Sequence, residues 1–175
     1  MRDLDIKDYI NHLPIVGLIA PPLIYLFFFG INSSAFSALG MSGDNMLLSV
    51  LIISLFIWVW SATYARSVNK FLKKQEKDNF KLVFGINSFA WSLGLIFWFI
   101  FDSLGMVMSN IFLAIGFLLI FIFILDNFVR VWLTSIAFDL EIKTSLNANK
   151  FVLIIETILY LPYALFSMSL GSAFI

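Results

Sequence analysis

The stretch MLLSVLIISLFIWVWSATYARSVNKFLKKQEKDNFK, residues 46–81, decides the fold class. Residues 46–65 contain no charged side chain, and an apolar helix of about 20 residues covers the roughly 30 Å hydrocarbon core of a bilayer. Cytoplasmic loops of membrane proteins are enriched in Lys and Arg. The segment that follows has this character, because it contains Arg66, Lys70, Lys73, Lys74, Lys77 and Lys81.

The composition of the whole chain is that of a membrane protein. Its 175 residues are 61% hydrophobic and 13% charged, with a mean hydropathy of +0.98, which is too apolar for a soluble domain. The formal net charge is zero, so overall electrostatics indicates no nucleic-acid partner. The sequence has no Cys and a single His, His12, which excludes disulfides, thiolate nucleophiles and bis-histidine haem within one chain. We therefore expect no metal site and no cofactor.

Five apolar runs of similar length follow one another along the chain. They show no alternating strand pattern, and lipid tolerates only helices or closed barrels as spanning elements. The sequence therefore predicts an all-α, polytopic transmembrane helical bundle of about five spans, in a single domain over residues 1–175. We expect the first run to remain in the mature chain because it lacks a small-x-small cleavage site. The predicted spans are residues 13–31, 46–65, 82–101, 111–131 and 151–170.

The basic residues predict how the chain is oriented. When the five runs are read as spans, all 11 Lys and Arg residues fall on one side, and the loops 32–45 and 102–110 contain none. The positive-inside rule then predicts a cytoplasmic N-terminus and a C-terminus on the opposite side. All Lys and Arg residues lie on one predicted side and no transit peptide is visible, which favours a bacterial inner membrane.

The end of the fourth run is the least certain boundary. Residues 111–140 are mostly apolar but are interrupted by Asp126, Asn127 and Arg130. We expect one long helix that continues as an amphipathic segment along the inner surface, over about residues 132–142. The alternative is a re-entrant segment or sixth half-span. The apolar residues at helical spacing in this segment are Trp132, Leu133, Ile136, Ala137 and Leu140.

Three charged residues lie inside the predicted spans, where a charge is expensive and usually functional. Glu156 is about 7.5 Å inside the fifth span, and Asp126 is roughly 6 Å from the inner edge of the fourth. Arg130 follows Asp126 by one helical turn, a favourable spacing for an ion pair. The functional interpretation is a proton or ion relay, or a site for a substrate head group. In the structural interpretation, Arg130 neutralises Asp126 at the interface and Glu156 anchors neighbouring helices.

A polar stripe extends from Glu156 along the fifth span. Tyr160, Tyr163 and Ser167 follow Glu156 at intervals of four, three and four residues, which predicts one shared helical face. Pro162 interrupts the backbone beside them. Such a stripe could line a wet path or pair with a neighbouring helix.

Pro21 and Pro22 lie near the middle of the first span and remove two backbone donors, so the carbonyls of Gly17 and Leu18 need other partners. We expect a kink or a broken helix, which serves either as a transporter hinge or as an ordinary structural bend. In the third run, a small polar patch beside two glycines is typical of close helix packing. It consists of Asn87, Ser88 and Ser92, with Gly85 and Gly94 nearby.

The basic segment is amphipathic as well as charged. Val68, Phe71 and Leu72 recur at helical spacing beside the basic residues, which predicts a stretch that lies on anionic lipid. Each basic residue near such a surface contributes about 1 kcal/mol. Docking of a cytosolic partner is the alternative. The predicted lipid-facing residues are Arg66, Lys70, Lys73, Lys74 and Lys77.

No catalytic motif is recognisable, so we assign no catalytic residue. Three functions remain as hypotheses. The first is a non-catalytic subunit or assembly partner, whose polar stripes pair with other membrane chains or with a second copy. The second is a small ion- or proton-coupled transporter or channel that uses Glu156 and the face of Tyr160 and Tyr163. The third is an intramembrane or lipid-handling enzyme, whose catalysis would depend on Glu156 or Asp126.

Overall fold

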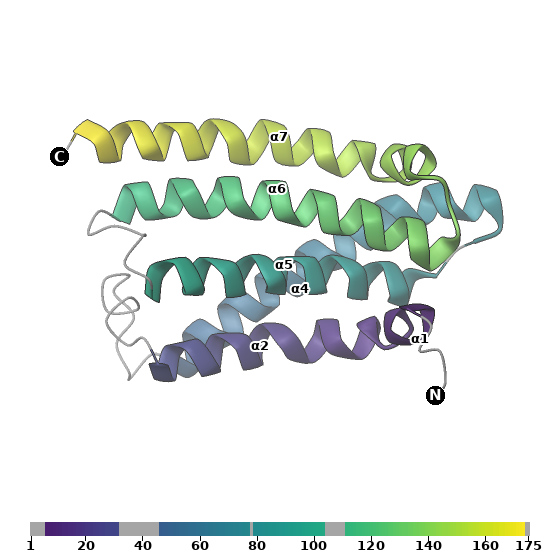
Figure 1. Ribbon diagram of the computed structural model, residues 1–175, viewed down its shortest axis with the longest axis horizontal. Helices are drawn as coiled ribbons and strands as arrows, with labels where there is room; N and C mark the ends of the chain where they lie inside the picture. Colours follow the sequence, from purple (N-terminus) through teal and green to yellow (C-terminus); the bar gives the residue numbers. More distant parts are fainter. Residues whose placement is uncertain (1–5, 32–45, 78, 104–110, 174–175) are drawn as a thin grey trace.

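The computed structural model describes residues 6–31, 46–77, 79–103 and 111–173. Within these ranges every regular element is a helix, which confirms the all-helical class predicted from the sequence (Figure 1). The elements are α1 (Ile6–Ile10), α2 (Leu13–Ile31), α4 (Met46–Leu72), the 3-10 helix η2 (Lys73–Gln75), α5 (Phe80–Ser103), α6 (Ile111–Phe138) and α7 (Ile142–Ala173).

Three helical stretches of the described ranges are long and apolar enough to cross a membrane. They are Val50–Gln75, Phe80–Phe97 and Ile142–Leu170. Leu13–Phe27 is a shorter apolar helix. This composition is that of a membrane protein. The loop 32–45 and residues 104–110, which the sequence assigns to the far side of the membrane, lie outside the described residues.

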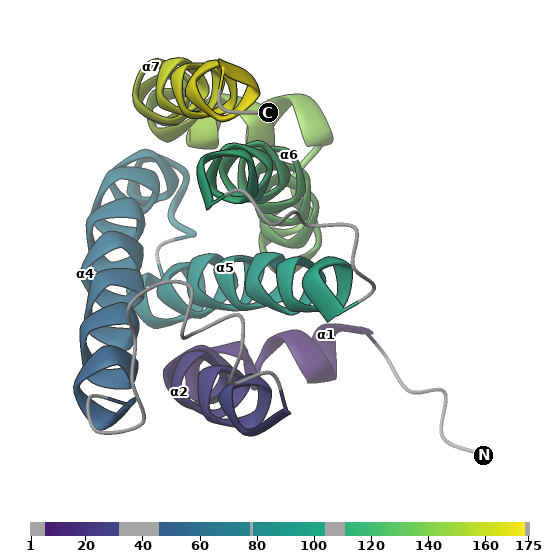
Figure 2. The ribbon, with the colours of Figure 1, turned by 90° about the vertical axis from the view of Figure 1, so that its left-hand side faces the viewer.

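The helices form a bundle that α4 crosses obliquely. In Figure 1, α2, α5, α6 and α7 run along the long axis of the bundle, and Figure 2 shows α4 along one side of it. The most extensive contacts join α6 to α7 and α2 to α5. Helix α5 also packs on α6, and α4 contacts α2, α5 and α7. The start of α1 and the end of α7 lie at opposite ends (Figure 1). We call the end with α1 the basic end, and the other the far end.

Helix α6 is continuous from Ile111 to Phe138, beyond the predicted span. Its last turns pack into the core through Leu133 and Phe138, so the segment after Arg130 is the inward-packed end of α6. The chain then reverses over three residues, with Asp139 in the left-handed region at a φ of 51°. The Leu140 N–H donates to the carbonyl of Ser135 at 2.9 Å and closes the turn.

The basic segment continues α4 and turns its apolar side toward the protein. Val68 and Leu72 are fully buried and Phe71 packs against the same core. The face predicted to lie on lipid is therefore a core face, because α4 continues beyond its predicted span and packs on its neighbours. Lys77 donates to the carbonyls of Phe138 and Asp139 at 2.9 and 3.2 Å. Arg66, Lys70, Lys73, Lys74 and Lys77 are all exposed, and their contact with anionic lipid stays a prediction.

Helix α2 continues across Pro21 and Pro22 without a break. The Ser88 hydroxyl of α5 donates at 2.5 Å to the carbonyl of Gly17, which is the group that Pro21 deprives of its helical partner. This bond is possible because the two helices touch: a Cβ on Gly17 would lie 3.0 Å from the Cα of Gly85. The predicted close packing is confirmed, and a hinge at the prolines stays a prediction.

Candidate functional site

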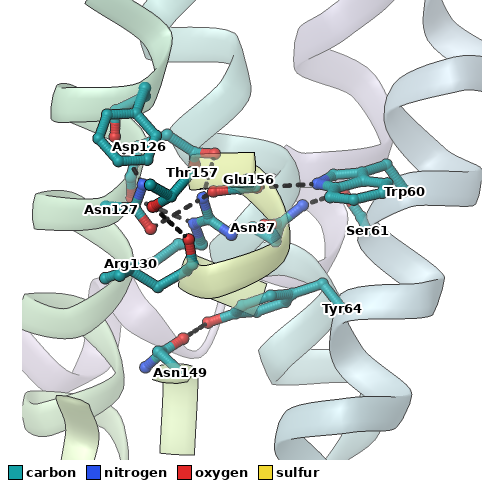
Figure 3. Close-up of polar contacts among 12 residues, drawn as sticks. Trp60, Ser61, Tyr64, Asn87, Asp126, Asn127, Arg130, Asn149, Glu156 and Thr157 are labelled. Carbon is teal, nitrogen blue, oxygen red and sulfur yellow. Dashed lines mark hydrogen bonds and ion pairs between the residues drawn. The ribbon is translucent and has the colours of Figure 1, made fainter. Parts of the chain in front are cut away.

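The three charged residues of the predicted spans meet inside the bundle. Arg130 Nη2 lies 2.6 Å from Asp126 Oδ2 and also pairs with Glu156 Oε2 (Figure 3). The exposed fractions are 1% for Arg130, 1% for Asp126 and 0% for Glu156. We call these residues the acid–base cluster. Arg130 is therefore buried inside the bundle and paired with both acids. Its predicted position at the membrane interface stays a prediction.

The local geometry explains why these residues meet. Asp126 and Arg130 are one turn apart on α6, and the Arg130 Nε also donates to the Asp126 carbonyl at 3.2 Å. Helices α6 and α7 form an antiparallel hairpin around the turn at residues 139–141. Asp126 and Glu156 lie about 18 and 21 Å from the helix ends that face this turn, at 1.5 Å per residue. Their similar distance from the turn brings the two carboxylates to the same level.

Helix α4 completes the surroundings of the cluster. The Trp60 indole N–H donates to Glu156 Oε1 at 3.1 Å. One turn later, the ring of Tyr64 lies 5.0 Å from the Arg130 guanidinium carbon, a favourable cation–π arrangement. The Tyr64 hydroxyl donates to Asn149 Oδ1 of α7 (Figure 3). The sequence interpretation missed Trp60, although the spacing of four residues between Trp60 and Tyr64 puts both rings on one face of α4.

The cluster contains one more acid than base. Two carboxylates and one guanidinium leave a formal excess of one negative charge. Both Glu156 oxygens accept hydrogen bonds, whereas Asp126 Oδ1 has no partner among the described residues. An uncompensated buried charge is costly. One added proton would bring the formal charge of these three side chains to zero.

An aromatic layer lies next to the cluster on its far-end side. Tyr160 is one turn after Glu156 on α7, and its ring lies 6.2 Å from Trp60 and 6.1 Å from Trp91 of α5. Trp91 also meets Phe56 of α4 edge to face at 5.8 Å. The aromatic rings of three helices, α4, α5 and α7, therefore meet one turn from Glu156.

Tyr163 does not belong to this site. It is 59% exposed, whereas its neighbour Ala164 is fully buried. The reason is the contact between α7 and α6 at Gly116, where an added Cβ would lie 2.9 Å from the Ala164 carbonyl. In its second half α7 therefore presents Ala164 to α6, and Tyr163 points outward. The predicted stripe is interrupted at Tyr163, while Ser167 is 4% exposed.

The site has no obvious place for a metal ion. Among the residues that the structure describes, no group of three or more acidic, His or Cys side chains is placed to hold one. The guanidinium of Arg130 lies where a cation between the two carboxylates would bind. The chain matches no protein-family model, no curated protein and no solved structure. Its function is therefore inferred from the geometry of the site.

Proposed function

We propose that this chain is a five-span membrane transporter that couples the binding of one proton to the movement of a small ion or solute. The observation that carries the proposal is the pair of fully buried carboxylates that share one guanidinium. Ionisable residues inside a membrane are rare and commonly mark proton or ion pathways. A cluster with one excess acid has a charged and a neutral form, and these are the two forms that a proton-coupled protein requires.

The contacts suggest how a proton would act. Arg130 is tied to Asp126 within α6, but its pair with Glu156 joins α6 to α7. Glu156 also accepts the indole N–H of Trp60 and so ties α7 to α4. A proton on Glu156 weakens both ties, since a neutral acid is a poorer acceptor than a carboxylate. Arg130 keeps its partner on α6. Proton binding would then loosen α7 from its neighbours and favour a second arrangement of the helices.

The proposed topology has α2 and α6 as the two additional spans, with a cytoplasmic N-terminus. Helix α4 ends, and α5 and α7 begin, at the basic end of the bundle (Figure 1). The lysines that flank these helix ends therefore lie on one side, which supports a cytoplasmic location for that end. A bacterial inner membrane is part of the same proposal. These lysines are Lys70, Lys73, Lys74, Lys77, Lys81, Lys143 and Lys150.

The hypothesis of an assembly subunit has less support than transport. It was based on polar stripes that need partners on other chains. Glu156 instead pairs with Arg130 of the same chain, and Asn87 donates to Ser61 at 2.8 Å. Glu156 and Asn87 therefore have partners within the bundle, whereas Tyr163 of the predicted stripe is exposed.

The proposal is tested by charge movement after a pH jump. Purified protein in liposomes is adsorbed on a solid-supported membrane, and the current that follows sudden acidification is recorded. We expect a transient current from the wild type that is lost in Glu156→Gln and strongly reduced in Asp126→Asn. The matched control is Glu141→Gln, which neutralises an exposed acid next to α7 and should leave the current unchanged.

Two results would overturn the proposal. One is a wild-type current no larger than that of protein-free liposomes. The other is a current of wild-type size in a folded Glu156→Gln protein. The folded state of each variant is checked by helical circular dichroism and by elution as a single species in gel filtration.

A further inference from the structure

Buried polar atoms without partners occur on both α4 and α5 of the described chain. Ser54 Oγ, Asn87 Oδ1 and the Trp91 indole nitrogen have no hydrogen-bond partner among the described residues. The three side chains belong to residues that are 1%, 0% and 6% exposed. Buried polar atoms are almost always paired with protein or with ordered water, and lipid offers them no partner. Each therefore has room for a partner beyond the described residues.

One contact between α4 and α5 orders these atoms along the bundle. The Asn87 side chain donates to Ser61 Oγ at 2.8 Å, which fixes the level at which α4 and α5 meet (Figure 3). Only η2 and a short turn at the basic end separate the two helices, so α4 runs toward this end and α5 runs away from it, with α4 crossing the bundle obliquely. Ser54 lies two turns before Ser61, and Trp91 lies one turn after Asn87. Both therefore lie beyond the Ser61–Asn87 contact in the direction of the far end. We call Ser61, Asn87 and Trp91 the α4–α5 seam; Ser54 is a further buried polar residue of α4 toward the far end.

The seam begins beside the acid–base cluster. Ser61 directly follows Trp60, whose indole N–H donates to Glu156 (Figure 3). Trp91 meets the ring of Tyr160 at 6.1 Å, and Tyr160 is one turn from Glu156 on α7. The unpaired atoms thus extend from the level of the acids toward the far end. The Asn149 and Tyr64 contacts lie on the opposite side of the acids, toward the basic end.

We propose that the α4–α5 seam binds internal water molecules, which connect Glu156 with the far end of the bundle. The chemistry of the unpaired atoms fits water, since Asn87 Oδ1 accepts, the Trp91 indole donates and a Ser hydroxyl does both. A buried water usually makes about three hydrogen bonds of mixed direction. These unpaired atoms are uncharged, so they do not favour an ion. Water binding stands by itself, and the role as the far-side half of a proton path rests on the proposed function.

Water in the seam is measured at the indole groups. In protein labelled with ¹⁵N-tryptophan and reconstituted in bilayers, water-edited solid-state NMR reports the transfer of magnetisation from water to each indole N–H. The Trp91 signal is assigned with Trp91→Phe. We expect rapid transfer to Trp91 in the wild type and a several-fold slower transfer in Asn87→Leu. The control is Ser92→Ala, which should leave the transfer unchanged because the Ser92 hydroxyl bonds to a carbonyl of its own helix.

The outcome separates this inference from the proposed function. Absence of water transfer to Trp91 in the wild type would overturn the water site, whatever the pH-jump current. Water transfer without a wild-type pH-jump current would leave the water site standing and overturn the proton function. For the path itself, Asn87→Leu should slow proton release on the far side several-fold relative to Ser92→Ala, and an equal rate would refute it. If Asn87→Leu does not fold, Ser54→Ala provides the same comparisons.

Discussion

Replacement of Arg130 by Met is the most direct test of the buried cluster. The substitution keeps an unbranched apolar stem but removes the partner of both Asp126 and Glu156, whose exposed fractions are 1% and 0%. Removal of one partner from a buried ion pair costs about 3–5 kcal/mol, because the remaining charge is left uncompensated. Here two like charges remain, and the cation–π contact with Tyr64 is also lost. We therefore expect a loss of at least about 3–5 kcal/mol in unfolding free energy.

The magnitude is checked by equilibrium unfolding in mixed micelles of increasing dodecyl sulfate content. The matched variant combines Arg130→Met with Asp126→Asn and Glu156→Gln, so that no charge remains in the cluster. It should recover most of the loss, since the cost arises from unpaired charge rather than from packing. A loss of less than about 1 kcal/mol in the unfolding free energy of Arg130→Met would be typical of an exposed ion pair. It would refute the burial of the acid–base cluster. Failure of the triple variant to recover stability would show that packing around Arg130 dominates.

Three further substitutions test the fold by the same unfolding assay. Ser88→Ala should cost about 1–3 kcal/mol, because the carbonyl of Gly17 is left buried without a donor; no measurable loss would contradict that bond. Gly85→Ala should cost more than the 1–3 kcal/mol typical of overpacking, since its Cβ would lie 2.5 Å from the Leu13 carbonyl carbon. A folded, fully stable variant would contradict the close approach of α2 and α5. Lys77→Met should cost less than about 1 kcal/mol, because this exposed side chain only caps the end of α6; a larger loss would mean that the cap is buried in the membrane-embedded protein.

The acid–base cluster could be predicted because so few charges interrupt the apolar runs. Asp126 and Arg130 are four residues apart, and one short turn leads from their helix to that of Glu156. Proximity along the chain was therefore enough to bring the three together. The contribution of α4 could not be predicted in this way, because Trp60 and Glu156 are separated by 96 residues. A lipid-embedded helix is apolar on all sides, so its hydropathy does not reveal which face meets a neighbour.

The span limits and the polar stripe show a second reason for failure. Hydropathy ends a span at the first charged residue, but helical hydrogen bonds do not depend on lipid, and α4 continues to Leu72. The prediction of a polar stripe on α7 assumed that the same face of this helix packs against the bundle along its whole length. The contact at Gly116 instead selects Ala164, so Tyr163 is turned outward although it has the expected spacing. The packing angle between helices, which decides such positions, is not encoded by the spacing of residues on one of them.

The second acid is the feature that a purely structural role does not explain. A buried ion pair is a weak source of stability, and apolar residues of similar volume often replace it without loss. If Arg130 served only to join α6 to α7, Glu156 alone would compensate its charge. Asp126, one turn away on the same helix as Arg130, adds a second carboxylate that joins no helices. The two acids together leave a buried negative charge in formal excess, which is costly unless a proton compensates it. Because Glu156 ties α7 to α6 and α4, the proposed function depends on whether the excess charge of the cluster changes these contacts between helices.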